Sequence, residues 1–191
     1  MSIKLIAHRG NLFGPEKEKE NTPEYIDQAI NKGFYAEIDV WTRGDNFFLG
    51  HDEPTYEISM QWLLERHDSL YLHAKNISSF FFFKDRTRFN TFFHTTEDYV
   101  ITSNGETIVR SSGIVPGIFY PNNTIFVMPE TAEIKLPIYR SLISDYAGLV
   151  YNFEHPDYDK IPDIIKLKTE EPTITQNEGE GKPDNILQLN G

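Results

Sequence analysis

The sequence predicts an α/β protein: a reduced (β/α)8 barrel of the TIM type, with short or missing outer helices. Short apolar runs alternate with helical segments, which is typical of parallel β/α units. Polar and charged residues recur just after those runs, and the sites of such barrels gather at the carboxyl ends of the strands. The chain has 191 residues, whereas about 250 are typical of the fold. Several outer helices, mainly between residues 94 and 150, are therefore expected to be reduced.

The first elements follow from one apolar run and one set of helix-capping residues. Residues 3–8 are interpreted as a buried strand that ends at His-Arg-Gly. Thr22 as N-cap and Pro23 at the first helical position predict a helix that Gly33 ends. The next strand is expected over residues 35–41.

The later elements are shorter and more weakly patterned. They are, in chain order, a return strand at 46–50, a helix at 59–66 capped by Ser59, a strand at 70–74, a buried helix around 80–83, strands at 91–94, 100–103 and 124–128, and one bent strand or two over 142–146 and 149–153. A weakly patterned loop is expected after residue 103. We expect residues 1–167 to form the barrel, and the polar segment 168–191 to be a flexible tail outside it.

Composition excludes several classes of protein. The chain has 18 Lys+Arg against 29 Asp+Glu, a net charge of −11, which disfavours binding to nucleic acid. It has no apolar run of the about 18 residues that a membrane span needs. The absence of cysteine excludes disulfides and thiolate metal sites. The first residues reach charge too soon for a secretory signal, so a cytoplasmic location is the default expectation.

Glu37 and Asp39 form the central candidate site. They lie two residues apart in the expected strand 35–41, so both carboxylates project from the same face. Buried and unpaired, they would be costly and would repel each other. A divalent cation, Mg²⁺ or Ca²⁺ by preference for carboxylate oxygens, would remove both objections. A solvent-facing pair on an edge strand is the alternative that spacing alone leaves open.

Four short motifs occur in order over the first quarter of the chain: His8-Arg9-Gly10, Glu20-Asn21-Thr22 at a helix start, Glu37-Ile38-Asp39, and His51-Asp52. This ordered set resembles the glycerophosphodiester phosphodiesterase family. That family belongs to the barrel superfamily that also holds phosphatidylinositol-specific phospholipases C and sphingomyelinases D. Beyond the first quarter the resemblance is thin.

The resemblance implies a role for each matched residue. His8 and His51 would be the acid–base pair, Glu37 and Asp39 would bind the metal, Arg9 would contact phosphate, and Asn21 would help to shape the site. The chemistry needs these residue types, because cleavage of a phosphodiester requires one proton acceptor and one proton donor. Histidine, with an ordinary pKa of about 6.5, can serve as either near neutral pH.

The third strand departs from the family pattern, which is carboxylate–x–lysine. This chain has His73-Ala74-Lys75, so Lys75 matches and would face the phosphate, while His73 replaces the acid. His73 could still ligate the metal through a ring nitrogen, and Mn²⁺ or Zn²⁺ then become possible beside Mg²⁺ and Ca²⁺. Glu130 or Asp145 could supply the missing charge. Glu130 is expected, with Arg9, Asn21 and Lys75, to contact the substrate.

The expected function is metal-assisted hydrolysis of a small, soluble phosphodiester, giving an alcohol and a phosphomonoester such as glycerol 3-phosphate. Two alternatives remain open. The chain could be a degenerate barrel that binds a phosphorylated ligand without turning it over. It could instead be a metal-dependent hydrolase of another bond, with His8, His51, His73 and His94 as ligands. His94 is otherwise as consistent with a structural histidine as with a pocket residue, and the oligomeric state is left open.

Overall fold

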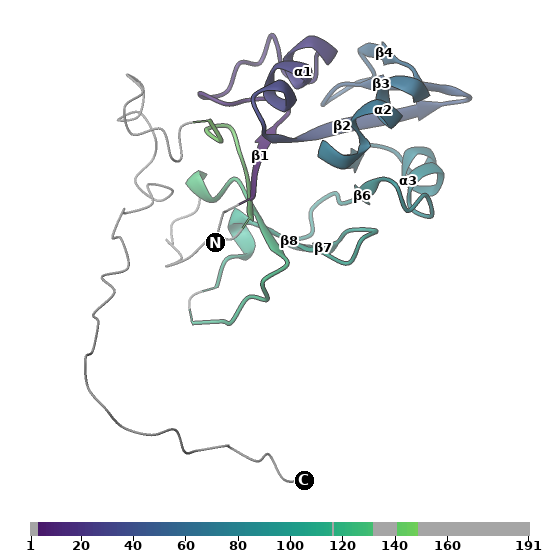
Figure 1. Cartoon of the computed structure of the whole chain (residues 1–191). Helices are drawn as coiled ribbons and strands as arrows, with labels where there is room; N and C mark the ends of the chain where they lie inside the picture. Colours follow the sequence, from purple (N-terminus) through teal and green to yellow (C-terminus); the bar gives the residue numbers. More distant parts are fainter. Residues whose placement is uncertain (1–3, 116, 132–140, 149–191) are drawn as a thin grey trace, which may run out of the picture.

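The computed structural model describes residues 4–115, 117–131 and 141–148 (Figure 1). The strands are β1 (Lys4–His8), β2 (Tyr35–Arg43), β3 (Asn46–Leu49), β4 (Tyr56–Ile58), β5 (Leu70–Ala74), β6 (Asn90–Phe92), β7 (Tyr99–Ile101), β8 (Thr107–Arg110), β9 (Thr124–Val127) and β10 (Ser141–Ser144). The helices are α1 (Pro23–Asn31), α2 (Met60–Arg66) and α3 (Ile77–Phe83), with 3₁₀ turns at His67–Ser69, Ser111–Gly113 and Pro129–Thr131. An α/β fold with few helices is therefore confirmed.

The parallel strands follow the order β6-β5-β2-β1-β10-β9-β8 across one curled sheet. β1 lies between β2 and β10, so the first strand of the chain pairs with the last described one, as in a β/α barrel. Antiparallel strands extend the sheet: β3 and β4 beside β2, and β7 beside β8. The carboxyl ends of the parallel strands, with the polar residues that follow them, therefore lie at one rim of the sheet.

The described strands form an open half-barrel, which corrects the expectation of a reduced but closed (β/α)8 barrel. β6 pairs with β5, and the outer edge of β8 is taken by β7, so β6 and β8 do not pair with each other. The connection between β6 and β7, residues 93–98, is too short for a helical crossover, which needs about a dozen residues. The chain therefore turns back antiparallel after β6. We call the open place between β6 and the β7–β8 pair the seam; there the Ser103 N–H donates to the Thr91 carbonyl at 2.7 Å.

Alternate residues of the strands face opposite sides of the sheet. Ile6, Tyr71, Phe92, Ile108, Ile125 and Ile143 form one buried cluster from six different strands, which only the inside of the curl can bring together. The neighbouring residues Ala36, Ile38 and Val40 of β2 instead pack toward the helices on the outside. Since the side-chain period of a strand is two, Glu37 and Asp39 face the inside.

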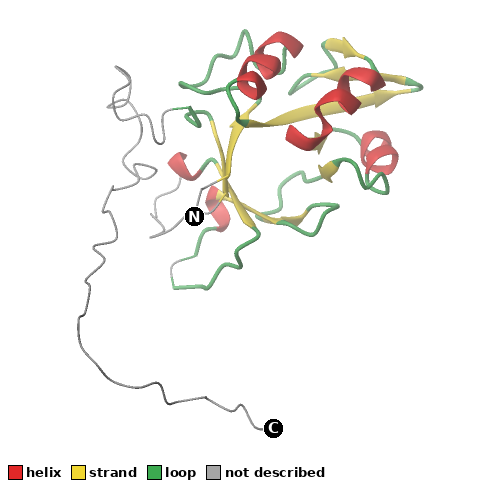
Figure 2. Cartoon of the chain, in the orientation of Figure 1, coloured by secondary structure: helices red, strands yellow, loops and turns green. Residues whose placement is uncertain are grey.

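The three helices lie against the outer side of the sheet next to β2 and β5 (Figure 2). Each begins at a side chain that accepts a hydrogen bond from the first turn: Thr22 for α1, Ser59 for α2 and Asn76 for α3. The caps predicted at Thr22 and Ser59 are confirmed. The predicted helix around residues 80–83 is also confirmed, but only part of it is buried, because Phe81 is 60% exposed.

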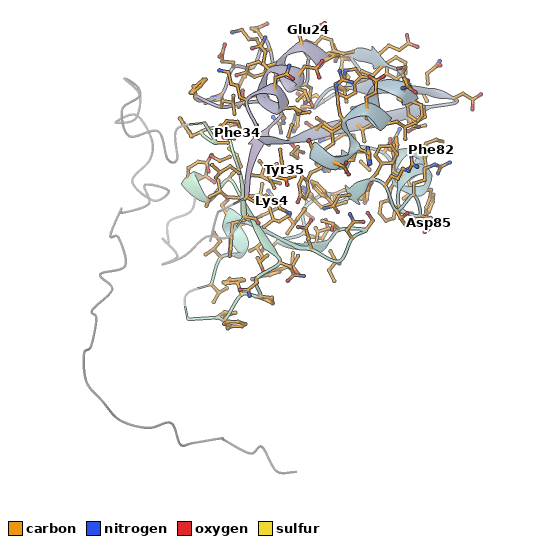
Figure 3. The ribbon with its side chains drawn as sticks, in the orientation of Figure 1. Lys4, Glu24, Phe34, Tyr35, Phe82 and Asp85 are labelled. Carbon is orange, nitrogen blue, oxygen red and sulfur yellow. The ribbon has the colours of Figure 1, made fainter. Side chains whose placement is uncertain are left out.

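The amino ends of the strands are closed by a polar cluster. The Lys4 ammonium donates to the Tyr71 hydroxyl at 2.7 Å and to the Glu106 carboxylate at 2.9 Å. It also lies 5.4 Å from the ring centre of Tyr35, its neighbour in Figure 3. Asn90 donates to Glu106 as well. These contacts join β1, β5 and β6 to the start of β8 across the open sheet, and they hold its two halves together.

Two strands were not predicted. β4 and β8 are short, and residues 104–123 were expected to form a loop. The expected strand at 149–153 and the tail at 168–191 lie outside the described residues. Within the part of the chain that is described, no helix combines the length and the apolar character needed to cross a membrane.

Candidate active site

The expected site residues gather at the carboxyl ends of β1, β2 and β5. Arg9 has φ +52°, Asn21 has φ +61° and Met128 has φ +50°, and these are the non-glycine residues with positive φ in the described chain. All three lie beside the acid pair or line the cavity next to it. Such backbone is costly for residues other than glycine and tends to persist at functional sites.

The acid pair is buried and faces inward, which rules out the solvent-exposed alternative. Glu37 is 3% exposed and Asp39 is 0% exposed. Asn21 holds Asp39 from two sides: its amide donates to Asp39 Oδ2 at 2.9 Å, and its side-chain oxygen accepts from the Asp39 backbone N–H at 2.9 Å. Asn21 therefore fixes the position of Asp39.

Three cationic or ionisable groups surround Asp39. Arg9 Nε lies 3.0 Å from Oδ2, while His73 Nδ1 and Lys75 Nζ lie 2.9 Å and 3.4 Å from Oδ1. Burial alone would raise the pKa of Asp39, but His73, Arg9 and Lys75 together hold that pKa well below its usual range. The Asp39 carboxylate is thus ionised at neutral pH.

Glu37, Asp39 and His73 form the group that could hold a metal ion. One ligand atom from each lies within 4.8 Å of the other two, and all three side chains are buried. Asp39 Oδ1 is buried without an aligned hydrogen bond, although His73 lies at ion-pair distance. An orphaned carboxylate oxygen among converging ligands fits a divalent cation. His8, His51 and His94 are not in this group, so the described residues do not form a four-histidine site.

A proton can also occupy this group. Burial alone would lower the pKa of His73, but the neighbouring Asp39 and Glu37 carboxylates outweigh burial and raise it. Since a metal ligand must be a neutral imidazole, a bound cation and the protonated His73 exclude each other. The charge of the Glu37 and Asp39 carboxylates can therefore be balanced either by a bound cation or by a proton on His73.

His8 is fixed by a residue from the other end of the chain. Its Nδ1 lies 2.8 Å from Asp145 Oδ1, and that oxygen also accepts the Asn11 amide at 2.7 Å. Burial alone would lower the pKa of His8, but the contact with Asp145 and the charge of Glu37 raise it. His51 has a similar partner, with Nδ1 2.7 Å from Asp52 Oδ1. Among the described residues, neither ring has a hydrogen-bond partner at Nε2.

One cavity of about 460 Å³ brings most of the predicted residues together. Both histidines of the expected acid–base pair line it, His8 from the end of β1 and His51 after β3. The other predicted residues in its wall are Arg9, Glu37, His73 and Lys75. Asp39 contacts Arg9 and Asn21, so the structure brings these residues together beside the cavity.

Glu130 lies elsewhere. Its Oε1 accepts hydrogen bonds from the Ser144 hydroxyl at 2.7 Å and from the Asp145 N–H at 3.1 Å, and it is not in the cavity wall. Burial raises the pKa of this carboxyl. Glu130 thus supports the segment that carries Asp145, and the structure gives no contact between Glu130 and the cavity.

The cavity also contains residues that sequence reasoning missed or left open. The rings of His73 and His94 are stacked, with centres 4.4 Å apart and planes within 6°. The Phe92 ring is also parallel to that of His73, with centres 4.9 Å apart, and its centre lies 5.9 Å from that of His94. Arg110 lines the cavity from the end of β8. The sequence signal for His94 was its place after a strand, whereas Arg110 had none because β8 was not predicted.

Comparisons of the chain with protein-family models, with curated proteins and with solved structures find no match. Functional reasoning therefore rests on the geometry of the cavity and on the four motifs. The geometry adds what the motifs could not: the residues of all four motifs lie at one rim of one sheet.

Proposed function

We propose that this protein is a metal-assisted phosphodiesterase of the glycerophosphodiester type. The observation that carries the proposal is that His8 and His51 line one cavity together with Glu37 of the buried acid pair. Cleavage of a phosphodiester needs a proton acceptor for the attacking oxygen, a proton donor for the leaving oxygen, and positive charge near the phosphoryl oxygens. The cavity offers all three.

The two imidazoles are prepared for proton transfer at Nε2. Asp145 and Asp52 each engage Nδ1 of their partner histidine, which fixes the ring and directs the proton of a neutral imidazole to Nδ1. Nε2 then accepts a proton when the ring is neutral and donates one when it is charged. One histidine takes a proton from the attacking water as its oxygen bonds to phosphorus, and the other protonates the alkoxide that leaves as the bond to the alcohol breaks, which gives the alcohol and the phosphomonoester.

Arg9 and Lys75 provide positive charge for the phosphate. Both line the cavity, and both side chains also lie close to Asp39. The ion pairs with the Asp39 carboxylate hold both side chains in place, and both still line the cavity. Charge-assisted hydrogen bonds to the non-bridging oxygens would orient the diester between the two histidines.

Glu37, Asp39 and His73 would hold the divalent cation. When bound, a cation polarises a phosphoryl oxygen and stabilises the charge that develops on it. With an imidazole in the ligand set, Mn²⁺ or Zn²⁺ become candidates beside Mg²⁺ and Ca²⁺. We interpret the half-barrel that carries this group as a reduced form of the (β/α)8 barrel that the motif resemblance implies.

The degenerate binder remains a second candidate because a specific observation favours it. Arg9, His73 and Lys75 already surround Asp39, and a protonated His73 would satisfy the acid pair without metal. Such a site would hold a phosphorylated ligand through its cations alone. It would bind a phosphomonoester or diester equally well with and without chelator, and it would not release product.

The test is a screen of divalent cations with small glycerophosphodiesters, in which glycerol 3-phosphate release is measured with and without chelator. We expect release that depends on an added cation. Glu37→Gln, which keeps the shape of the side chain, should lower turnover at least about 100-fold, because one metal ligand and its charge are lost.

His67→Ala is the matched control. His67 also has its Nδ1 engaged, by the Leu64 carbonyl at 2.8 Å, but it does not line the cavity. Its turnover should equal that of the wild type. Binding of glycerol 3-phosphate without hydrolysis of any diester, with or without cation, would overturn the phosphodiesterase proposal in favour of the binder.

A further inference from the structure

Arg110 is a cation in the cavity wall that the proposed reaction does not use. It ends β8, where the inward-facing Ile108 and strand alternation also direct Arg110 to the inside. β8 borders the seam, whereas the acid pair lies on β2 and His73 lies on the neighbouring β5. Arg110 therefore lines the same cavity from a different strand than the proposed metal group.

Its side chain has no partner among the described residues. Arg9 is occupied by Asp39 and Glu20, and Lys75 lies beside Asp39. In contrast, the guanidinium of Arg110 makes no hydrogen bond or ion pair in the described part of the chain, although Arg110 is only partly exposed. A guanidinium carries five donors in a fixed fork that matches a carboxylate or a phosphate.

His94 adds a second unsatisfied group to this wall. It follows β6 on the other side of the seam, and its Nδ1 is buried without a hydrogen-bond partner. Arg110 is close enough for its charge to act on His94. The two side chains thus flank the seam, and within the described ranges neither the Arg110 guanidinium nor His94 Nδ1 has a hydrogen-bond partner.

We propose that Arg110, with His94 beside it, binds a second anionic group of the substrate, located on the alcohol arm of the phosphodiester. The preferred substrates would then carry a carboxylate or a phosphate on that arm. This inference rests on the proposed function, because it assumes that the reacting phosphate lies at the acid pair and the two histidines.

The charges of the cavity wall favour an anionic arm over a cationic one. Arg9, Lys75 and Arg110 contribute three cationic side chains, and Glu37 contributes the carboxylate. Glu37 belongs to the proposed metal group, so no other acidic side chain of the wall remains for an ammonium group. A trimethylammonium arm would meet Arg110 and be repelled.

The test uses two matched pairs of diesters. Glycerophosphoserine differs from glycerophosphoethanolamine by one carboxylate, and glycerophosphoinositol 4-phosphate differs from glycerophosphoinositol by one phosphate. We expect the anionic member of at least one pair to have a higher kcat/KM, by about 10- to 100-fold, as for a charge-assisted hydrogen bond. Comparison of the two pairs distinguishes a carboxylate from a phosphate.

Arg110→Gln should reduce that ratio to near one, and Arg110→Lys should give an intermediate ratio, because it keeps the charge but loses the fork. Arg43→Gln, at the exposed end of β2, is the matched control and should keep the wild-type ratio. Equal kcat/KM within both pairs for the wild type, or an unchanged ratio in both Arg110 variants, would overturn the inference.

A calorimetric measurement separates this inference from the proposed function. If no diester is hydrolysed, the phosphodiesterase proposal fails, but binding of the same matched pairs can still be compared. Tighter binding of the anionic member, lost in Arg110→Gln, would support the anion subsite in a binding protein. Equal binding of both members would overturn it.

Discussion

The imidazole of His8 and the carboxylate of Asp145 lie 2.8 Å apart, although 137 positions separate them in the sequence. The contact is possible because β1 and β10 pair in parallel, with Ala7 opposite Ser144. Asp145 thereby follows the last described strand at the point where His8 ends the first. The pairing of β1 with β10 thus places Asp145 where it orients the His8 imidazole.

Asp145→Asn should lower kcat about 100-fold with little change in KM, because the amide no longer favours the Nδ1 proton or a charged ring. That loss is at the lower end of what acid–base catalysis contributes. Steady-state kinetics on a glycerophosphodiester checks it. Asp68→Asn is the control, since Asp68 lies 3.2 Å from His67 Nε2 in a similar contact away from the cavity. Equal losses in both variants would contradict the positioning role.

The same pair predicts a pH dependence of stability. The pKa of His8 in the folded protein is raised above its ordinary value of 6.5. The contact therefore stabilises the fold fully below pH 6.5, and this contribution is lost as the pH rises through the folded pKa. We compare urea unfolding of wild type and Asp145→Asn from pH 5 to 9 with chelator present. The difference in free energy of unfolding should shrink above pH 6.5; a constant difference would argue against a charged pair.

His73→Asp should restore an all-carboxylate metal group. A third hard oxygen ligand favours Mg²⁺ and Ca²⁺, so their affinity should rise at least about tenfold and the preference for Zn²⁺ should fall. Isothermal calorimetry with each chloride salt measures this. His94→Asn is the control, because that ring stacks on His73 but lies outside the group of possible ligands. Unchanged Ca²⁺ affinity in His73→Asp would show that residue 73 is not a ligand.

Asn21 holds Asp39 through two hydrogen bonds and also occupies a backbone position with positive φ. Two substitutions can separate these two roles. Asn21→Ala loses both hydrogen bonds to Asp39 and places a Cβ-bearing residue at φ +61° without local hydrogen bonding. Asn21→Gly loses the same bonds without the steric cost, so it should be more stable than Asn21→Ala by about 1–2 kcal/mol. Chemical denaturation checks the order. Equal stability of the two variants would mean that the backbone at Asn21 relaxes.

The placement of the motif residues was more predictable than the sheet, because each motif is local in sequence. Glu37 and Asp39 are two apart, and that spacing alone fixes a shared face in a strand. Thr22 and Pro23 likewise mark the start of α1 from neighbours in sequence. His8 and His51 lie in the wall of one cavity for a related reason: His8 ends one short strand and His51 closely follows another.

What could not be predicted depends on contacts distant in sequence. The pairing of His8 with Asp145 required the register of β1 against β10, so Asp145 was considered only as a source of charge. Glu130 was expected to contact substrate, but its hydrogen bonds go to Ser144 and the Asp145 backbone. β8 is four residues long and its pattern is weak, so Arg110 was assigned to a loop.

The central claim is that His8 and His51 act on one phosphorus, and a double-variant comparison tests it most directly. Turnover of one glycerophosphodiester is measured for wild type, His8→Ala, His51→Ala and the double variant, each checked for folding by circular dichroism. We predict that each single variant loses about 10²- to 10⁴-fold, and that the double variant loses little more, since residues that act as a unit are not additive. Wild-type turnover in either single variant would contradict the claim.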